Sequence, residues 1–189
     1  MTGLNSPSHF IATPSSISPT YTPEAPVDSV KGAGAVSVAV EDLRAAPGKV
    51  GNDTGLAIKA GNGVISTTVP VKDLVRTAIE SELRNRGFTI AGGGAGIAIA
   101  ITEFDVQHSQ SATLMAVQSY SYAAVMIHAT VTGAGHKRLY SQPISAQSAS
   151  ADGNDQATLD RALAMAMHNL FADPLFIKAI LTAERGPKS

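Results

Sequence analysis

The side chains in this sequence that could act as general bases are histidines, and their neighbours do not form a catalytic constellation. The histidines are His9, His108, His128, His136 and His168. A serine nucleophile on a sharp strand-to-helix turn would appear as G-x-S-x-G, and the sequence has no such motif. Glu80 and Glu82 do not form a carboxylate pair, because residues two apart on a helix point in different directions. We therefore expect no catalytic residues and a protein that is not an enzyme.

The positions of the histidines favour structural roles over metal binding. His128 follows the alternation of a strand, which is typical of a half-buried sheet residue rather than of a base in a cleft. His108 ends a strand near Glu103 and Asp105, and a metal ion there would need further ligands that the spacing does not supply. The sequence has no Cys, which excludes thiolate metal sites and disulfides. We expect no metal site.

A glycine-rich stretch, Gly92–Gly96, resembles a phosphate-binding loop only in composition. Neither G-x-G-x-x-G nor G-x-x-x-x-G-K-[ST] can be written there, and a strand follows instead of a helix whose N-terminus could hold an anion. The stretch is therefore predicted to be a turn, and we expect no bound cofactor.

The residues best placed to bind a partner lie on the strand predicted over residues 120–132. One face of this strand carries Val125, Ile127, Ala129 and Val131, and the other face carries Tyr120, Tyr122 and Met126. Branched aliphatic side chains pack well beneath helices, which favours burial of the first face. Tyr120, Tyr122 and Met126 would then form an exposed stripe that contacts a partner or a second copy. The alternative is that this stripe belongs to the core.

The first 34 residues are predicted to form an extended tail or linker. Their prolines stand among Ser and Thr, a composition that favours polyproline conformation or disorder. Phe10, Ile11, Ile17 and Tyr21 are the large apolar side chains of this tail. The tail is therefore either a plain linker or a segment that docks on a neighbour, with Phe10 and Tyr21 as candidate contacts.

Composition limits the remaining possibilities. The 189 residues suffice for one domain plus a tail, and 44% of them are hydrophobic, which is enough for a core. The net charge of −1 argues against nucleic-acid binding, which requires a surplus of clustered Lys and Arg. No apolar run is long enough to span a bilayer. The first residues, Met1–Leu4, lack a basic stretch followed by an apolar one, so no signal peptide is visible.

An amphipathic helix predicted over residues 71–86 organises the rest of the chain. Its apolar residues recur at helical spacing. Pro70 suits the start of this helix, and Gly87 is placed to end it in a left-handed conformation. A strand over residues 35–43 precedes the helix, and strands follow at 97–108, 120–132 and 137–148, with a β-bulge near Thr102. Pro143 marks the last strand as an edge strand or a bulged one.

The predicted fold is an α+β domain over residues 35–185. The order of its elements is β-α-β-β-β-α, and hairpin connections indicate a mainly antiparallel sheet with two helices on one face. The last helix is capped by Asp152 or Asn154, and Asp173 and Pro174 interrupt it before a short helical restart. The segments 56–59 and 64–68 are predicted to pair as a small hairpin around Gly61–Gly63.

An ordered series of short segments resembles the YajG-type family of bacterial envelope lipoproteins. The segments are Ile17–Thr20, Val36–Val38, Thr68–Pro70, Leu83–Phe88, Ile99–Val106, the strand from Tyr120, Lys137–Tyr140 and Leu170–Ile177. The likeness covers most of the chain. The wider group is similar to transport-auxiliary lipoproteins with a TolB-like amino-terminal fold. This resemblance implies no catalytic residue and no cofactor.

The resemblance also implies a location. It implies a periplasmic domain that a lipidated N-terminal Cys tethers to the outer membrane through a Pro-rich linker, although this sequence lacks that Cys and its lipobox. We expect an accessory or structural component of an envelope assembly, which binds other envelope proteins or a second copy of itself and no nucleic acid. The alternative is a lipid- or small-ligand-binding accessory subunit of an envelope transport system, which would need an apolar cleft between helix and sheet.

Overall fold

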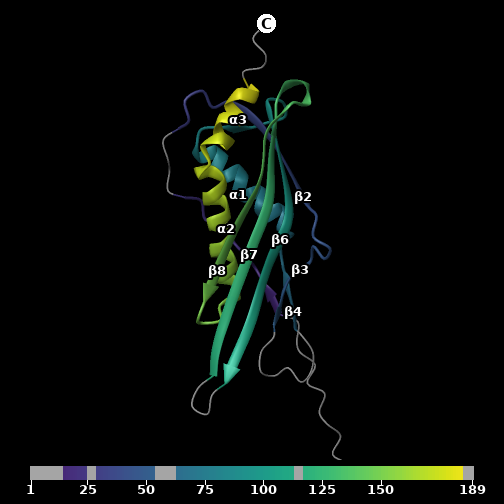
Figure 1. Ribbon diagram of the computed structural model, residues 1–189, viewed down its shortest axis with the longest axis vertical. Helices are drawn as coiled ribbons and strands as arrows, with labels where there is room; N and C mark the ends of the chain where they lie inside the picture. Colours follow the sequence, from purple (N-terminus) through teal and green to yellow (C-terminus); the bar gives the residue numbers. More distant parts are fainter. Residues whose placement is uncertain (1–14, 25–28, 54–62, 113–116, 185–189) are drawn as a thin grey trace, which may run out of the picture.

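A computed structural model describes residues 15–24, 29–53, 63–112 and 117–184 (Figure 1). Phe10 and the predicted strand 56–59 lie outside the described residues. The strands are β1 (Ser15–Ile17), β2 (Ala35–Asp42), β3 (Lys49–Asp53), β4 (Gly63–Thr67), β5 (Thr89–Ile90), β6 (Ala95–Ala112), β7 (Val117–Thr132) and β8 (Arg138–Ser150). The helices are α1 (Val71–Asn85), α2 (Asp155–Ala172) and α3 (Pro174–Glu184), with a short 3₁₀ turn, η2 (Ala134–His136), between β7 and β8.

The long antiparallel strands β6, β7 and β8 form the centre of the sheet. β7 pairs with β6 on one side and with β8 on the other. Residues on β6 and β7 stay in register except between Ile101 and Glu103, where the pairing shifts by one residue. This shift confirms the β-bulge predicted near Thr102, where the apolar alternation changes phase.

The other edge of β6 is shared by two strands that lie end to end. β2 pairs in parallel with residues 95–101 of β6, and β3 pairs in parallel with residues 106–108. Of the seven strand pairings in the described residues, four are parallel and three are antiparallel. The α+β class is therefore correct, but the prediction of a mainly antiparallel sheet is wrong. α1 lies between β2 and β6 in the chain and makes that connection a crossover, which brings the two strands together in parallel.

α1 forms where the sequence predicted it. Pro70 precedes the first helical residue, and Val71, Leu74, Val75, Ala78, Ile79 and Leu83 are buried along one face of the helix. Gly87 has a φ of +88°, and its N–H donates to the carbonyl of Arg84. This left-handed residue ends the helix, as its position after Arg86 predicted.

The prediction of two helices is wrong, because the chain past Asp173 forms a third one. Asn154 caps α2, with its Oδ1 accepting the Ala157 N–H at 3.0 Å. The Asp173 carboxylate accepts the Leu175 N–H at 2.8 Å at the start of α3. α3 is 11 residues long and buries Phe176 and Ile180 in the core. It is therefore a full packing element rather than a short extension of α2.

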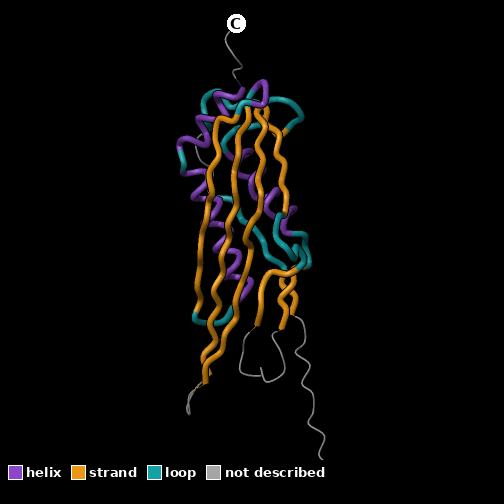
Figure 2. Tube along the Cα trace, turned by 45° about the vertical axis from the view of Figure 1, so that its right-hand side comes forward, coloured by secondary structure: helices purple, strands orange, loops and turns teal. Residues whose placement is uncertain are grey.

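All three helices cover the same face of the sheet. The side chains beneath them include Val40 of β2, Ile99 of β6 and Val125, Ile127 and Val131 of β7, all of which are buried. Residue pairing places these side chains on one side, because Val40 lies beside Ile99 and Ile99 lies beside Ala129. In Figure 2 the helices lie behind the strands of the central sheet. The branched aliphatic face is thus the buried one, as the alternation on β7 indicated.

β8 is an edge strand, as Pro143 predicted, and the residues of α2 protect it. Asn169 donates to the carbonyl of Ser145 at 3.0 Å, and Arg161 donates to the carbonyl of Ala149 at 3.4 Å. Figure 1 shows α2 running beside β8. Pro143 has the same phase as Ser145, so its missing N–H falls on the outer edge, where no ladder bond is lost.

Residues 15–24 of the predicted tail lie on the domain. β1 pairs in parallel with β4, and the segment then crosses α2 and reaches the end of α1. The backbone N–H of Ser18 donates to Gln156 at 3.3 Å, and the backbone N–H of Thr20 donates to Asp160 at 2.8 Å. Ile17 and Tyr21 are partly buried against the core. The described part of the tail therefore contributes to the folded unit.

The buried carboxylate of Glu82 holds this N-terminal segment against α1. Glu82 is only 1% exposed, and it accepts hydrogen bonds from the Tyr21 hydroxyl at 2.6 Å and from the backbone N–H of Glu24 at 2.9 Å. It also pairs with Arg86, whose guanidinium lies 4.4 Å from the centre of the Phe171 ring. Burial alone would raise the pKa of Glu82, but the bonds from Tyr21, Glu24 and Arg86 outweigh it and hold the pKa below its ordinary value of 4.5.

Replacing Glu82 with Gln tests this network. Because the folded-state pKa is lowered, the stability from ionised Glu82 is complete above about pH 4.5 and is lost as the pH falls through the folded-state pKa. We expect Glu82→Gln to lower the free energy of unfolding at pH 7 by about 3 kcal/mol, because buried Arg86 loses the closer of its two carboxylate partners and keeps only Glu24 at 3.5 Å. Urea titrations between pH 3 and pH 7 should show a smaller loss of stability on acidification in the variant than in the wild type.

Glu80 provides the matched control on the same helix. It pairs with Arg84 at 2.8 Å, with the two side chains 21% and 55% exposed. Glu80→Gln should change the free energy of unfolding by less than about 0.5 kcal/mol, as exposed i,i+4 pairs do. Equal losses in the two variants would contradict the role given to Glu82.

Candidate functional site

The side of the sheet on which the described residues place no helix, called the open face below, presents many small and mostly uncharged side chains. Its residues are Ser37, Ala39 and Glu41 on β2; Ala98, Ala100, Glu103, Asp105 and Gln107 on β6; Tyr120, Tyr122, Ala124, Met126, His128 and Thr130 on β7; and Pro143, Ser145, Gln147 and Ala149 on β8. Alanine and serine side chains are frequent on this face and do not project far from the backbone. Such a surface lets another protein surface approach closely.

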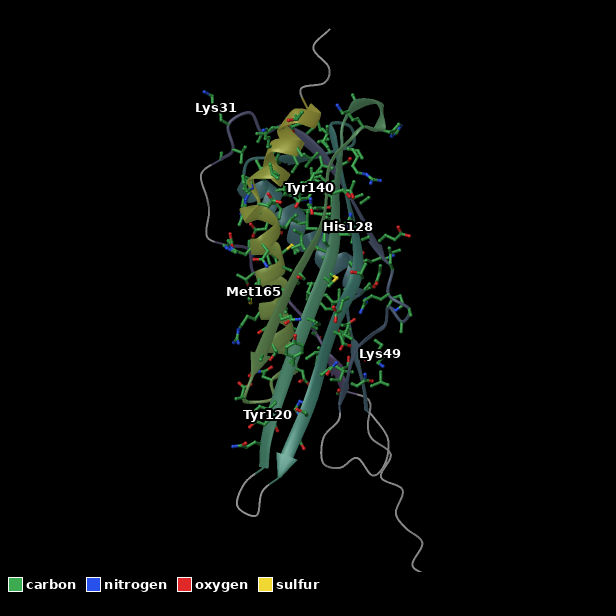
Figure 3. All side chains as sticks on the ribbon, viewed as in Figure 1. Lys31, Lys49, Tyr120, His128, Tyr140 and Met165 are labelled. Atoms are coloured by element: carbon green, nitrogen blue, oxygen red, sulfur yellow. The ribbon has the colours of Figure 1, made fainter. Side chains whose placement is uncertain are left out.

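Three large apolar side chains stand out from this flat surface. Tyr120 and Tyr122 are 41% exposed, and Met126 is 37% exposed. Tyr122 lies between Gln107 of β6 and Ala149 of β8, and Met126 lies between Glu103 and Ser145. Figure 3 shows Tyr120 toward the end of the long strands that lies away from α3, with His128 further along β7. The structure thus brings together the three strand residues that the sequence singled out.

Three acidic residues of the open face, Glu41 on β2 and Glu103 and Asp105 on β6, lie on one side of the stripe. Glu103 and Asp105 project from β6 beside Met126 and Ala124. Burial raises the pKa of Asp105, and the nearby Lys49 and Arg44 oppose that rise. A partner that covers this part of the face would have to supply hydrogen-bond donors or a cation to Glu103 and Asp105.

Tyr21, the candidate tail residue that the structure describes, does not join this site. Phe10 lies outside the described residues. The hydroxyl of Tyr21 donates to Glu82, and its ring packs against the core on the helical side of the sheet. Burial and the neighbouring Glu82 carboxylate raise the pKa of Tyr21. In this structure Tyr21 therefore makes its contacts within its own chain.

A cluster that the sequence did not reveal lies where α2 begins. The Nδ1 of His108 lies 3.0 Å from Oδ1 of Asp155, and the Ser121 hydroxyl donates to the same carboxylate. Asp155 is 47 residues away from His108 in the chain, so local spacing carried no signal of this contact. The sequence around His108 pointed only to Glu103 and Asp105, which belong to the same strand.

This cluster has the residue types of a catalytic triad but a different arrangement. The carboxylate lies between Ser121 and His108, and the other ring nitrogen of His108 lies 3.4 Å from Nε2 of Gln110. A serine nucleophile would donate to the histidine and face an open cleft, whereas Ser121 is only 1% exposed. The geometry suits a link between β6, β7 and the start of α2.

Gly153 makes that link possible. Its φ is +68°, and a Cβ there would lie 2.5 Å from the Cβ of Ser119 and 2.9 Å from Cε1 of His108. Only glycine can take this conformation and let the turn before α2 approach the His108 ring.

The glycine-rich stretch is a turn, as predicted. Gly94 has a φ of +88°, and a Cβ there would lie 2.0 Å from the carbonyl oxygen of Ala35. β6 begins at the next residue. Gly94 therefore allows the turn to enter β6 next to β2.

Two of the remaining described histidines, His128 and His168, make simple polar contacts, and His136 ends the 3₁₀ turn η2 between β7 and β8. The Nε2 of His128 lies 2.8 Å from the Ser141 hydroxyl on the open face, and the Nδ1 of His168 lies 2.6 Å from Glu24. Within the described ranges, no three His, Asp or Glu side chains converge as a metal site would require.

A pocket of about 560 Å³ lies between the start of α1 and the sheet. It is lined by the end of β2 (Val40–Asp42), by Pro47 and Gly48, by Thr67 and Thr68, and by Pro70–Lys72. No side chain caps the N-terminus of α1. The walls of the pocket are mainly apolar, with Glu41, Asp42 and Lys72 as its charged groups. Its volume lies in the range of small-molecule sites.

Comparisons with known proteins show a similar fold and no close sequence relative. The structure is similar to that of protein XCC0632 from Xanthomonas campestris, of the DUF330 family, with a TM-score of 0.52 and 13% identity over 90% of this chain and 96% of that chain. A second solved structure, described as an uncharacterized protein, is 10% identical over 83% of this chain and 99% of that one, with a TM-score of 0.47. No family model matches the sequence, and no curated protein matches it.

The helices were compared with the length and apolar character of membrane-spanning helices. In the parts of the chain that the structure describes, none of the helices has the combination of length and apolar character needed to cross a bilayer.

The role of Asp155 as a structural link can be measured. We expect Asp155→Ala to lower the free energy of unfolding by about 1–3 kcal/mol, because the buried Ser121 hydroxyl loses its acceptor. Asp73, an exposed acidic residue in the first turn of α1, provides the control. Asp73→Ala should cost about 0.3–1 kcal/mol, the value of a favourable helix-dipole contact. Covalent labelling of Ser121 by a serine-directed fluorophosphonate would overturn the structural role.

Proposed function

We propose that this protein is a non-enzymatic accessory component of an envelope assembly, which binds another envelope protein or a second copy of itself through the open face. The observation that carries the proposal is the open face itself. Tyr120, Tyr122 and Met126 project from a wide surface of small residues, on the side of the sheet that no helix covers. Aromatic and methionine side chains on an otherwise flat surface are typical anchors of protein interfaces.

The proposed location is the periplasm, with attachment to the outer membrane. It rests on the ordered series of segments that resembles YajG-type envelope lipoproteins, among them Leu83–Phe88 and Ile99–Val106. The fold shared with a DUF330 protein is compatible with this proposal but says nothing of location. A lipidated cysteine upstream of the Pro-rich segment would supply the anchor.

Photo-crosslinking in cells that carry the full gene tests the open face. A photo-reactive amino acid at Met126 should give discrete cross-linked species, because this side chain would lie inside the interface. Adding Tyr122→Ser should reduce their yield at least about tenfold, the effect of losing one interface hot spot.

Met165 on α2 provides the matched control, because it is also a methionine and is 43% exposed on the opposite side of the sheet. The same photo-reactive amino acid there should give no such species. Equal cross-linking from both positions, or a strict monomer with no cross-links from Met126, would count against the proposal. Recovery of the protein outside the outer-membrane fraction would remove the proposed location.

The pocket next to α1 supports a second candidate function, a lipid- or small-ligand-binding accessory subunit of an envelope transport system. The pocket lies between helix and sheet, where a ligand-binding subunit of this kind needs an apolar cleft. Its apolar walls include Val40 and Val71, and Lys72 offers a cation for an acidic headgroup.

Gly48→Phe tests this second candidate. Gly48 lines the pocket, and a Cβ there would meet no atom within 4 Å, so a large side chain fits at this position and is expected to narrow the pocket. Native mass spectrometry should show an amphiphile bound to the wild type and a loss of that species in the variant. Gly92→Phe is the control, because Gly92 is equally unobstructed and lies in the turn before β6. The wild type without any bound species would contradict the second candidate.

A further inference from the structure

β2 has an outer edge that is only partly paired among the described residues. β5 pairs with β2 at Ala35 and Val36, whereas β6 pairs with the other edge of β2 from Val36 to Asp42. The outer edge from Ser37 to Asp42 therefore has no neighbouring strand in the described part of the chain. At about 3.3 Å per residue, this stretch is about 20 Å long.

The hydrogen bonds at the two ends of β2 show which backbone groups face outward. The carbonyl of Val36 accepts the Ala91 N–H at 2.9 Å on the outer side, and the N–H of Leu43 donates to Ile101 of β6 at 3.0 Å. The backbone N–H and C=O groups of the even-numbered residues of β2 thus point away from β6. The outward N–H and C=O groups are those of Val38, Val40 and Asp42.

The opposite edge of the sheet, formed by β8, is protected by side chains. On β8, Pro143 removes one outward donor, and Asn169 and Arg161 bond to two outward carbonyls. Natural sheets protect long edges in this way because unprotected edges pair with other chains. On β2, no described side chain bonds to the outward groups of Val38 or Val40. Figures 1 and 2 show β2 at the margin of the sheet away from β8.

The 560 Å³ pocket lies at the end of this edge. Val40 and Asp42 of β2 form one wall, and Thr68 and Val71 form another. Val38, two residues before Val40 on the same strand, is only partly buried against the core. A strand placed beside β2 would therefore run past Val38 and reach the pocket at Val40.

We propose that the outer edge of β2 binds an extended segment of a partner polypeptide, which adds a strand in line with β5 and inserts an apolar side chain into the pocket. Only a polypeptide backbone supplies donors and acceptors that match the repeat of Val38, Val40 and Asp42. A lipid chain would fill the apolar pocket but leave these backbone groups without partners. The site is separate from the open face, so the loss of either proposal leaves the other standing.

Amide hydrogen exchange measured by NMR tests this inference on the intact protein. The probe is a capped six-residue peptide of alternating threonine and valine, and the control is the same peptide with all its amides N-methylated. At nine-tenths occupancy the exchange of the Val38, Val40 and Asp42 amides should slow about tenfold, because exchange then occurs only from the free fraction. The N-methylated peptide should leave these rates unchanged.

Proline substitutions add a matched pair of variants. Val38→Pro removes an outward donor and should prevent the peptide from protecting Val40 and Asp42. Gln147→Pro places proline in the outward phase of β8, where Pro143 is already accommodated, and should leave the protection intact. Circular dichroism checks that both variants are folded.

Three results would overturn the inference. The Val38 and Val40 amides could already exchange slowly in the free protein, which would show that the edge is covered. The peptide could protect β8 instead of β2. A phospholipid probe could slow the same amides as much as the peptide does, which would assign the pocket to a lipid.

Discussion

The structure depends on the alternation of branched aliphatic and small side chains along β6 and β7. Because successive residues of a strand point to opposite sides, Ile97, Ile99 and Ile101 all face the helices, and the alanines between them all face away. The bulge at Ile101–Glu103 lets the buried set continue with Phe104 and Val106 after the change of phase. One long hairpin therefore supplies the floor of the core and the open face at once.

This constraint explains which parts of the fold could be predicted from the sequence. The face of β7, the bulge, α1 with its Gly87 ending and the edge position of β8 all leave local signals of period, proline or glycine. The parallel pairings of β2 and β3 with β6 leave no such signal, because crossovers are decided by contacts between distant segments. α3 was underestimated because Asp173 and Pro174 both end one helix and begin another.

The residues of the candidate site also differ in whether the sequence alone could identify them. Tyr120, Tyr122 and Met126 could be identified because they share one strand and its alternation. The cluster of His108, Ser121 and Asp155 could not, because each residue has an ordinary place in its own element and the contact arises only when α2 docks. Tyr21 has the composition of a linker around it, and the buried carboxylate that it meets lies 61 residues further along the chain.

The contacts of residues 15–24 also bear on where this protein can be cut. Composition changes near Ala35, and a protein engineer would choose that point as the start of a minimal domain. Such a truncation would remove β1, expose Ile65 and Thr67 on β4 to water along a new edge, and leave Glu82 and Arg86 without the Tyr21 and Glu24 groups that now surround them. In three dimensions the boundary of the folded unit therefore lies at least 20 residues before the point at which the amino-acid usage changes.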